Sequence, residues 1–201
     1  VYRSDGEGNC DVERGFPVDG QPRSFPSCVA LSRAGAVPTR SNWFQANRAC
    51  AASGKRLATG AEGSSVKLWD LSTSSEVATL RGHTARINAL AVTSDGKYLI
   101  SGSEDSSLKL WDLGSLEELC TLIGHTAAVN GVAILNNRAF AVTASSDYSI
   151  KLWDFGKGAI VATFTGEAPF HCCAIARDGK TIVGGDDLGK LHLLQISGAI
   201  F

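Results

Sequence analysis

The amino-acid sequence predicts an all-β protein built from repeats, and three observations support this. Trp-Asp pairs occur at 69–70, 111–112 and 153–154, spaced by 42 residues each time. Gly-His pairs at 82–83 and 124–125 keep the same spacing. Within one interval, short alternating apolar segments such as INALAV, YLISGS, SLKLWD and ELCTLI are separated by turn-forming residues. Four short strands per repeat are typical of one blade of a β-propeller.

The N-terminal quarter departs from this alternation. Residues 1–38 are rich in Gly, Pro and charge, which predicts an irregular segment. In the following stretch, Trp43, Ala46 and Cys50 have the i, i+3, i+7 spacing of an amphipathic helix. Thr39 or Ser41 is suited to cap its start, and Gly54 suits its end. We therefore expect an irregular N-terminal domain over 1–53 with one short helix at about 41–52.

The repeats occupy the second domain, residues 54–201. A last, degenerate copy carries Leu194 and Gln195 where the Trp-Asp pair is expected. This domain holds only about three and a half repeats, fewer than most closed propellers contain. The prediction is a partial, open propeller of about four blades with the outer blades incomplete. Open blade edges carry unpaired backbone groups, so self-association is also expected.

The segments VKLWD, LKLWD and IKLWD, together with the Gly-His pairs, resemble the WD-repeat family over about residues 54–195. The resemblance implies a hydrogen-bonded His, Ser or Thr, Asp and Trp network inside each blade. Its expected members are His83, Ser101, Asp105, Trp111, His125, Thr143, Asp147, Trp153 and, in the first copy, Trp69. The first copy has Gly63 in place of Asp, and the last has Glu167 in place of His. Recurrence in successive blades favours a structural role over catalysis, and we expect no catalytic residue.

The run NWFQANRACAASGKRLATGAE resembles the formylglycine-generating (sulfatase-modifying factor) family, with a resemblance extending over about residues 12–62. The copper-binding cysteines of that family have no counterpart here. Residues 54–62 fit both resemblances, since GKRLATGAE is also in phase with GKYLISGSE of the next repeat. We expect the propeller to include this segment, with Leu57 and Thr59 pairing with the strand that ends at Trp69.

Composition excludes several classes of partner. The net charge is −1 and 19% of residues are charged, which argues against binding of nucleic acid or anionic membrane. No apolar run approaches the roughly 20 residues of a membrane span, and the start does not resemble a signal peptide. These features predict a cytoplasmic location. The chain contains no Met, which suggests a piece of a longer protein.

The six cysteines show no CxxC pair, so we expect no metal and no cofactor. In the sequence His171-Cys172-Cys173, neighbouring side chains of a strand would point to opposite faces, which favours small core thiols over a metal site. A disulfide among Cys10, Cys28 and Cys50 remains open.

These observations predict a non-catalytic scaffold that binds a protein or peptide partner. The stretch ATFTGEAPFHCCAIARDGKTIVGGDDLGKLHLLQI resembles the ends of propellers attached to bacterial signalling NTPases, which implies the sensing or docking arm of a larger regulatory protein. The alternative is a fragment of a formylglycine-generating-type oxidase, or of a lectin-like ligand-binding domain, joined to a propeller. In WD-repeat proteins the partner surface is commonly the face that holds the loops before each first strand and the turns that carry the network Asp. The residues at those positions are Arg86, Glu104, Ser146 and Glu62.

Overall fold

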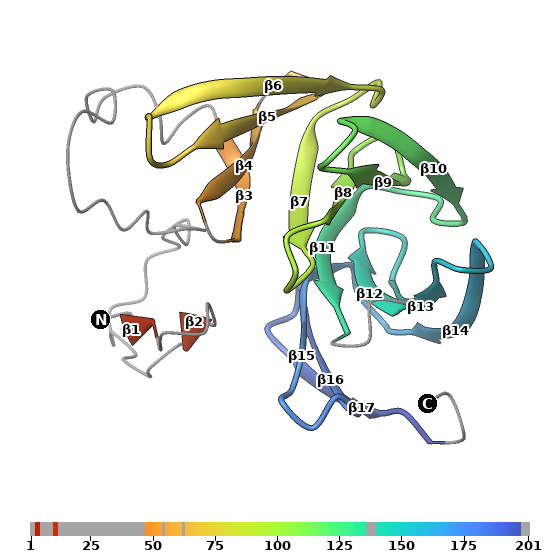
Figure 1. Cartoon of the computed structure of the whole chain (residues 1–201). Coiled ribbons are helices and arrows are strands. Elements are labelled where there is room, and N and C mark those ends of the chain that lie inside the picture. Colours follow the sequence, from red (N-terminus) through yellow and green to blue (C-terminus); the bar gives the residue numbers. More distant parts are fainter. Residues whose placement is uncertain are drawn as a thin grey trace, which may run out of the picture.

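The structure is a computed structural model that describes residues 3–4, 10–11, 47–53, 55–61, 63–135 and 140–197. Four antiparallel sheets follow one another along the chain, and each consists of consecutive strands (Figure 1). We number them sheets 1 to 4. A separate short pair, β1 (Arg3–Ser4) and β2 (Cys10–Asp11), precedes them.

The strand bounds follow the predicted repeat. Sheet 1 contains β3 (Asn47–Ser53), β4 (Arg56–Ala61), β5 (Ser65–Asp70) and β6 (Ser75–Arg81). Sheet 2 contains β7 (Ile87–Val92), β8 (Tyr98–Ser103), β9 (Ser107–Asp112) and β10 (Glu117–Ile123). Sheet 3 contains β11 (Val129–Ile134), β12 (Phe140–Ser145), β13 (Ser149–Asp154) and β14 (Ala159–Thr165). Sheet 4 contains β15 (Phe170–Ile175), β16 (Thr181–Asp186) and β17 (Leu191–Gln195).

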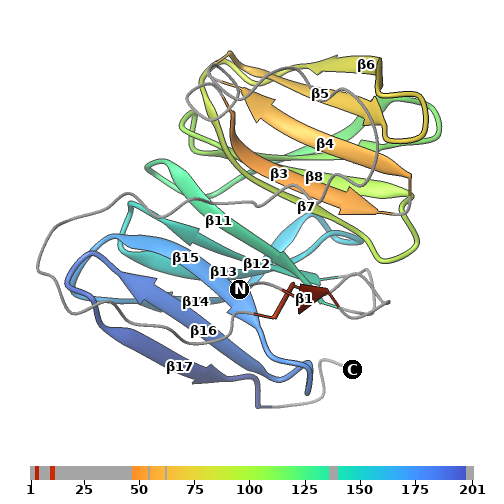
Figure 2. The same cartoon turned by 90° about the vertical axis from the view of Figure 1, so that its left-hand side faces the viewer.

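Successive sheets pack face to face, and their first strands β3, β7, β11 and β15 lie next to one another along the inner side of the stack (Figures 1 and 2). Because side chains alternate across a strand, each inner sheet contributes to two apolar layers. In β8, Leu99 packs toward sheet 1, whereas its neighbour Ile100 packs toward sheet 3. The fold therefore has one apolar core between each pair of adjacent sheets.

The four sheets form an open arc. Sheets 1 and 4 lie at its two ends, and extensive contacts among the described residues join only successive sheets (Figure 1). This is the all-β, partial propeller of four blades that the repeat spacing predicts.

The helix expected at about 41–52 is wrong over residues 47–52, which belong to β3, while residues 41–46 lie outside the described residues. Strand β3 pairs antiparallel with β4, with Cys50 opposite Thr59. This pairing supplies hydrogen-bond partners along the side of β3 that faces β4, and such contacts override the local periodicity that favoured a helix. Sheet 1 therefore begins at residue 47 rather than 54 and has all four strands. Of the two outer blades expected to be incomplete, only sheet 4, with three described strands, is incomplete.

The shared segment 54–62 is part of the propeller over its described residues. In β4, Leu57 pairs with Trp69 and Thr59 pairs with Lys67, which confirms the predicted pairing. Residues 12–46, which carry most of the other resemblance, lie outside the described residues.

Candidate functional site

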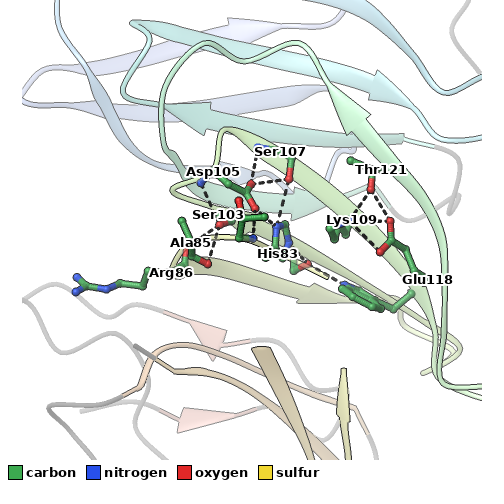
Figure 3. A network of polar contacts seen from close by, with 12 residues as sticks. His83, Ala85, Arg86, Ser103, Asp105, Ser107, Lys109, Glu118 and Thr121 are labelled. Atoms are coloured by element: carbon green, nitrogen blue, oxygen red, sulfur yellow. Dashed lines mark hydrogen bonds and ion pairs between the residues drawn. The ribbon is translucent and has the colours of Figure 1, made fainter. Parts of the chain in front are cut away.

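A buried polar network lies inside sheet 2, where it joins four of the predicted residues (Figure 3). His83 Nδ1 lies 2.8 Å from Asp105 Oδ2, and His83 Nε2 lies 2.8 Å from Ser101 Oγ. Trp111 Nε1 donates to the same Ser101 oxygen at 2.8 Å. Ser101 is fully buried and Trp111 is 2% exposed.

When His83 is neutral, every hydrogen bond of the network has one donor and one acceptor. Trp111 donates to Ser101, Ser101 donates to His83 Nε2, and the Nδ1 proton of His83 is donated to Asp105. Burial lowers the pKa of His83, more than its pairing with Asp105 raises it, which favours this neutral form. Burial also opposes the ionisation of Asp105, but hydrogen bonds from Ser107, Thr84 and His83 outweigh it and lower the pKa of Asp105 to about 2.

Sheet 3 repeats the arrangement with the second predicted set. His125 Nδ1 lies 2.7 Å from Asp147 Oδ2, and His125 Nε2 lies 2.7 Å from Thr143 Oγ1. Trp153 Nε1 donates to Thr143 Oγ1 at 2.8 Å. Burial again lowers the pKa of His125. The two networks thus share their geometry as well as their spacing in the sequence.

The glycine of each Gly-His pair lies close to the tryptophan and to a side chain of the outermost strand of its sheet, since an added Cβ would lie 2.7 Å from Glu118 Oε2 at Gly82 and 2.6 Å from Ile160 Cδ1 at Gly124. A Cβ at Gly82 would lie 3.1 Å from Trp111 Cη2, and one at Gly124 would lie 2.9 Å from Trp153 Cη2. A side chain at either position would push the indole away from its hydroxyl partner. In each Gly-His pair, the histidine therefore forms hydrogen bonds of the network, and the glycine leaves room for the tryptophan.

Further network residues were missed by the sequence analysis. They recur at 42 residues, a signal that could have revealed them: Thr84 and Thr126, Ser103 and Ser145, Ser107 and Ser149. The backbone N–H of Ser107 donates to Asp105 Oδ1 at 2.9 Å, which stabilises a turn whose central residue Ser106 has φ 67°. Asp105 therefore also fixes the loop that follows β8.

The outer sheets keep only parts of the network. In sheet 1, Trp69 Nε1 donates to Thr59 Oγ1 at 3.0 Å, and the exposed Gly63 replaces the aspartate. In sheet 4, Glu167 accepts a hydrogen bond from Lys190 Nζ at 2.8 Å, and Asp186 instead pairs with His192 Nε2 at 2.8 Å. Sheets 2 and 3 are thus the fully networked blades.

The network supports a loop face formed by the turns at one end of the sheets. The Ser103 hydroxyl donates to the carbonyl of Arg86, and the Glu104 N–H donates to the same carbonyl at 2.8 Å. The Arg86 side chain extends away from the network (Figure 3) and its Nη1 lies 3.7 Å from Glu104 Oε1. Ser146, the counterpart of Glu104, accepts a hydrogen bond from Asn130 Nδ2 at 2.8 Å. Three of the four predicted partner-binding residues therefore lie on loops of one face, while Glu62 lies outside the described residues.

The cysteines whose side chains the structure describes, Cys120, Cys172 and Cys173, do not form a cluster with other ligating groups. Across the described residues, no group of three or more His, Cys, Asp or Glu side chains has an arrangement suited to a metal ion. Cys172 is exposed and Cys173 points to the opposite face, where burial raises its pKa to about 12. The expectation of core thiols therefore fits Cys173 and is wrong for Cys172. No helix long and apolar enough to span a membrane occurs in the part of the chain that the structure describes.

Parts of the chain match known families of repeat proteins. Residues 74–112 match the family model described as WD domain, G-beta repeat, and residues 125–196 match the one described as TEP-1 C-terminal beta-propeller. No significant match to a curated protein was found. Among solved structures, the computationally designed Ika4 protein is similar with a TM-score of 0.68 and 25% sequence identity, covering 76% of this chain and 92% of that chain. These matches and the four successive sheets together support a WD-repeat β-propeller.

Proposed function

We propose that this chain is a non-catalytic scaffold that binds a protein or peptide partner through the loop face carrying Arg86, Glu104 and Ser146. WD-repeat propellers are generally protein-interaction scaffolds, typically without catalysis. The observation that carries the proposal is the repeated network. In sheets 2 and 3 its histidines and aspartates satisfy one another, so they fix loop positions and are not directed toward a substrate.

The loop face has the chemistry of a recognition surface. Arg86 is 28% exposed and Glu104 is 41% exposed, and their 3.7 Å separation leaves both able to pair with a partner. An exposed ion pair contributes little to folding, whereas arginine is enriched among residues that dominate binding energies. We further propose that the chain is the docking arm of a larger bacterial regulatory protein located in the cytoplasm. The C-terminal resemblance to propellers of signalling NTPases supports this role.

The test is the double variant Arg86→Ala with Glu104→Ala. We expect its melting temperature to stay within about 2 °C of the parent, since it removes only an exposed pair. Partner recovery in a quantitative pull-down from the source cells is expected to fall at least about tenfold, equivalent to about 1.4 kcal/mol of binding free energy.

The matched control is Lys97→Ala with Glu117→Ala. It removes one positive and one negative exposed residue from the opposite end of sheet 2, Lys97 from the turn before β8 and Glu117 from the start of β10. The control variant is expected to recover partners as the parent does. Equal recovery by all three proteins would show that this loop face is not the binding surface.

A further inference from the structure

The outward face of sheet 4 is apolar and exposed. Cross-strand pairing brings Cys172, Gly185 and Leu191 into one row, and Ala174, Val183 and Leu193 into the next row of the same face. Leu191 and Leu193 are each 74% exposed, and Cys172 and Ala174 are exposed as well. Apolar patches of this kind on a sheet mark surfaces that contact another protein element.

The register shows which element fits this face. In sheet 3, the equivalent rows are Gly131, Ala144 and Ile150, followed by Ala133, Val142 and Leu152. There the same positions are covered by sheet 4: Ile150 is 3% exposed, Leu152 is 4% exposed, and both pack in the core that includes Phe170 and Ile182. The outward face of sheet 4 therefore has the register and apolar character of a blade-to-blade interface that continues the stack.

Sheet 1, at the other end of the arc, has the type of face on which the outward face of sheet 4 could pack. In sheet 2, Leu99 and Trp111 lie on the face that packs against sheet 1, where they are 0% and 2% exposed. Their counterparts in sheet 1 are Leu57 and Trp69, paired opposite each other in the same register and only half-buried. Sheet 1 thus has the side chains that, in sheets 2 and 3, contact the preceding blade.

We propose that two copies of this chain associate head to tail, with the outward face of sheet 4 of each copy packed on the outward face of sheet 1 of the other. The two arcs then close into one ring of eight sheets, within the range of about 4–8 blades found in propellers. Interfaces between two different surface patches form closed rings when the rotation closes, and a third arc would exceed this range, so the assembly is a dimer. This inference is independent of the partner proposed for the loop face.

The mass of the full 201-residue chain in solution tests the proposal. Light scattering across micromolar concentrations is expected to show a shift from 21.1 kDa to twice that mass. Leu193→Asp places a carboxylate in the interface and is expected to raise the dimer dissociation constant at least about a hundredfold. The matched control Ile123→Asp changes an exposed apolar residue of β10, 80% exposed, and is expected to dimerise as the parent does.

The orientation is tested by mixing two variants. Leu57→Asp blocks the sheet 1 face and is expected to be monomeric alone, while its mixture with Leu193→Asp contains one intact interface and is expected to form a heterodimer. A Leu57→Asp variant that dimerises alone would overturn the head-to-tail arrangement, for example in favour of β17 pairing with β17.

Alkylation of Cys172, mapped by mass spectrometry, keeps the proposal testable if Leu57→Asp fails to fold. In the unmodified chain we expect the alkylation rate of this exposed thiol to fall at least about tenfold on dimer formation. A monomer at all concentrations, or an alkylation rate independent of concentration, would overturn the proposal.

Discussion

Replacing Trp111 with alanine tests how far the buried network stabilises the propeller. The indole is 2% exposed and lies in the core between sheets 1 and 2, so its truncation is expected to cost about 4 kcal/mol of unfolding free energy. Loss of the hydrogen bond to Ser101 adds about 1 kcal/mol. The expected loss of about 5 kcal/mol is a large part of the about 5–15 kcal/mol that stabilises an ordinary domain.

Trp69→Ala is the matched comparison. Trp69 donates an equivalent hydrogen bond to Thr59 at 3.0 Å, but its side chain is only half-buried. The hydrogen-bond contribution is therefore similar in the two variants, whereas the packing contribution of Trp69 is about half as large. We expect Trp69→Ala to lose about 3 kcal/mol, so the difference between the variants measures the burial of the ring.

Urea unfolding followed by circular dichroism measures both losses. The variants are best compared in the Leu193→Asp background, which is expected to keep the chain monomeric. If Trp111→Ala is too unstable to measure, Trp111→Phe retains an aromatic ring, removes the N–H donor and is expected to lose about 2 kcal/mol. Equal losses at positions 111 and 69 would refute the burial argument, and a loss below about 2 kcal/mol for Trp111→Ala would refute the role of the network.

Two further predictions concern acidity and close packing. The pKa values of His83 and His125 are lowered in the folded chain by burial, from an ordinary value of 6.5, so the unfolded chain binds more protons below that pH. Stability is then complete above about pH 6.5 and falls by up to about 1.4 kcal/mol per pH unit for each histidine as the pH decreases; a flat urea profile between about pH 7.5 and 5 would contradict this. A Cβ at Gly102 would lie 2.6 Å from Val129 Cγ1 of sheet 3, so Gly102→Ala is expected to lower the unfolding free energy by about 1–3 kcal/mol. The control Gly63→Ala, where a Cβ would meet nothing within 4 Å, is expected to be neutral, and equal melting temperatures for the two variants would show that the sheets can separate without cost.

The sequence predicted the sheets of the propeller well because each repeat carries the same local signals at the same spacing. The strands from β4 onward follow alternating apolar residues and turn residues, which are local properties. Strand β3 was mispredicted because Trp43, Ala46 and Cys50 have the spacing of one face of a helix. What makes it a strand is its pairing with β4, in a hairpin whose register runs from Ser53 opposite Arg56 to Asn47 opposite Ala61. The helix-like spacing of the apolar residues does not report this pairing.

The network residues were identifiable in part for the same reason. His83, Asp105 and Trp111 belong to the repeated motifs, and their hydrogen bonds have the geometry that the family resemblance implies. Ser103 and Ser107 have the same 42-residue recurrence but are small polar residues near a turn, where serine is common for many reasons. The pairing of Asp186 with His192 in sheet 4 was not predictable, because it replaces the repeated network rather than following it.

The 42-residue recurrence also distinguishes residues that support the fold from residues of the loop face proposed to bind a partner. The histidines and aspartates of the two networks repeat every 42 positions and satisfy one another within their own blade, at 2.8 and 2.7 Å. If the loop face binds the partner as proposed, specificity is expected to come from its exposed positions where the repeats differ. Arg86 has Ala128 as its counterpart one repeat later, and Glu104 has Ser146. At these positions one blade differs chemically from the next, while the buried networks of sheets 2 and 3 share the same geometry. A partner that binds the loop face is therefore expected to contact these positions.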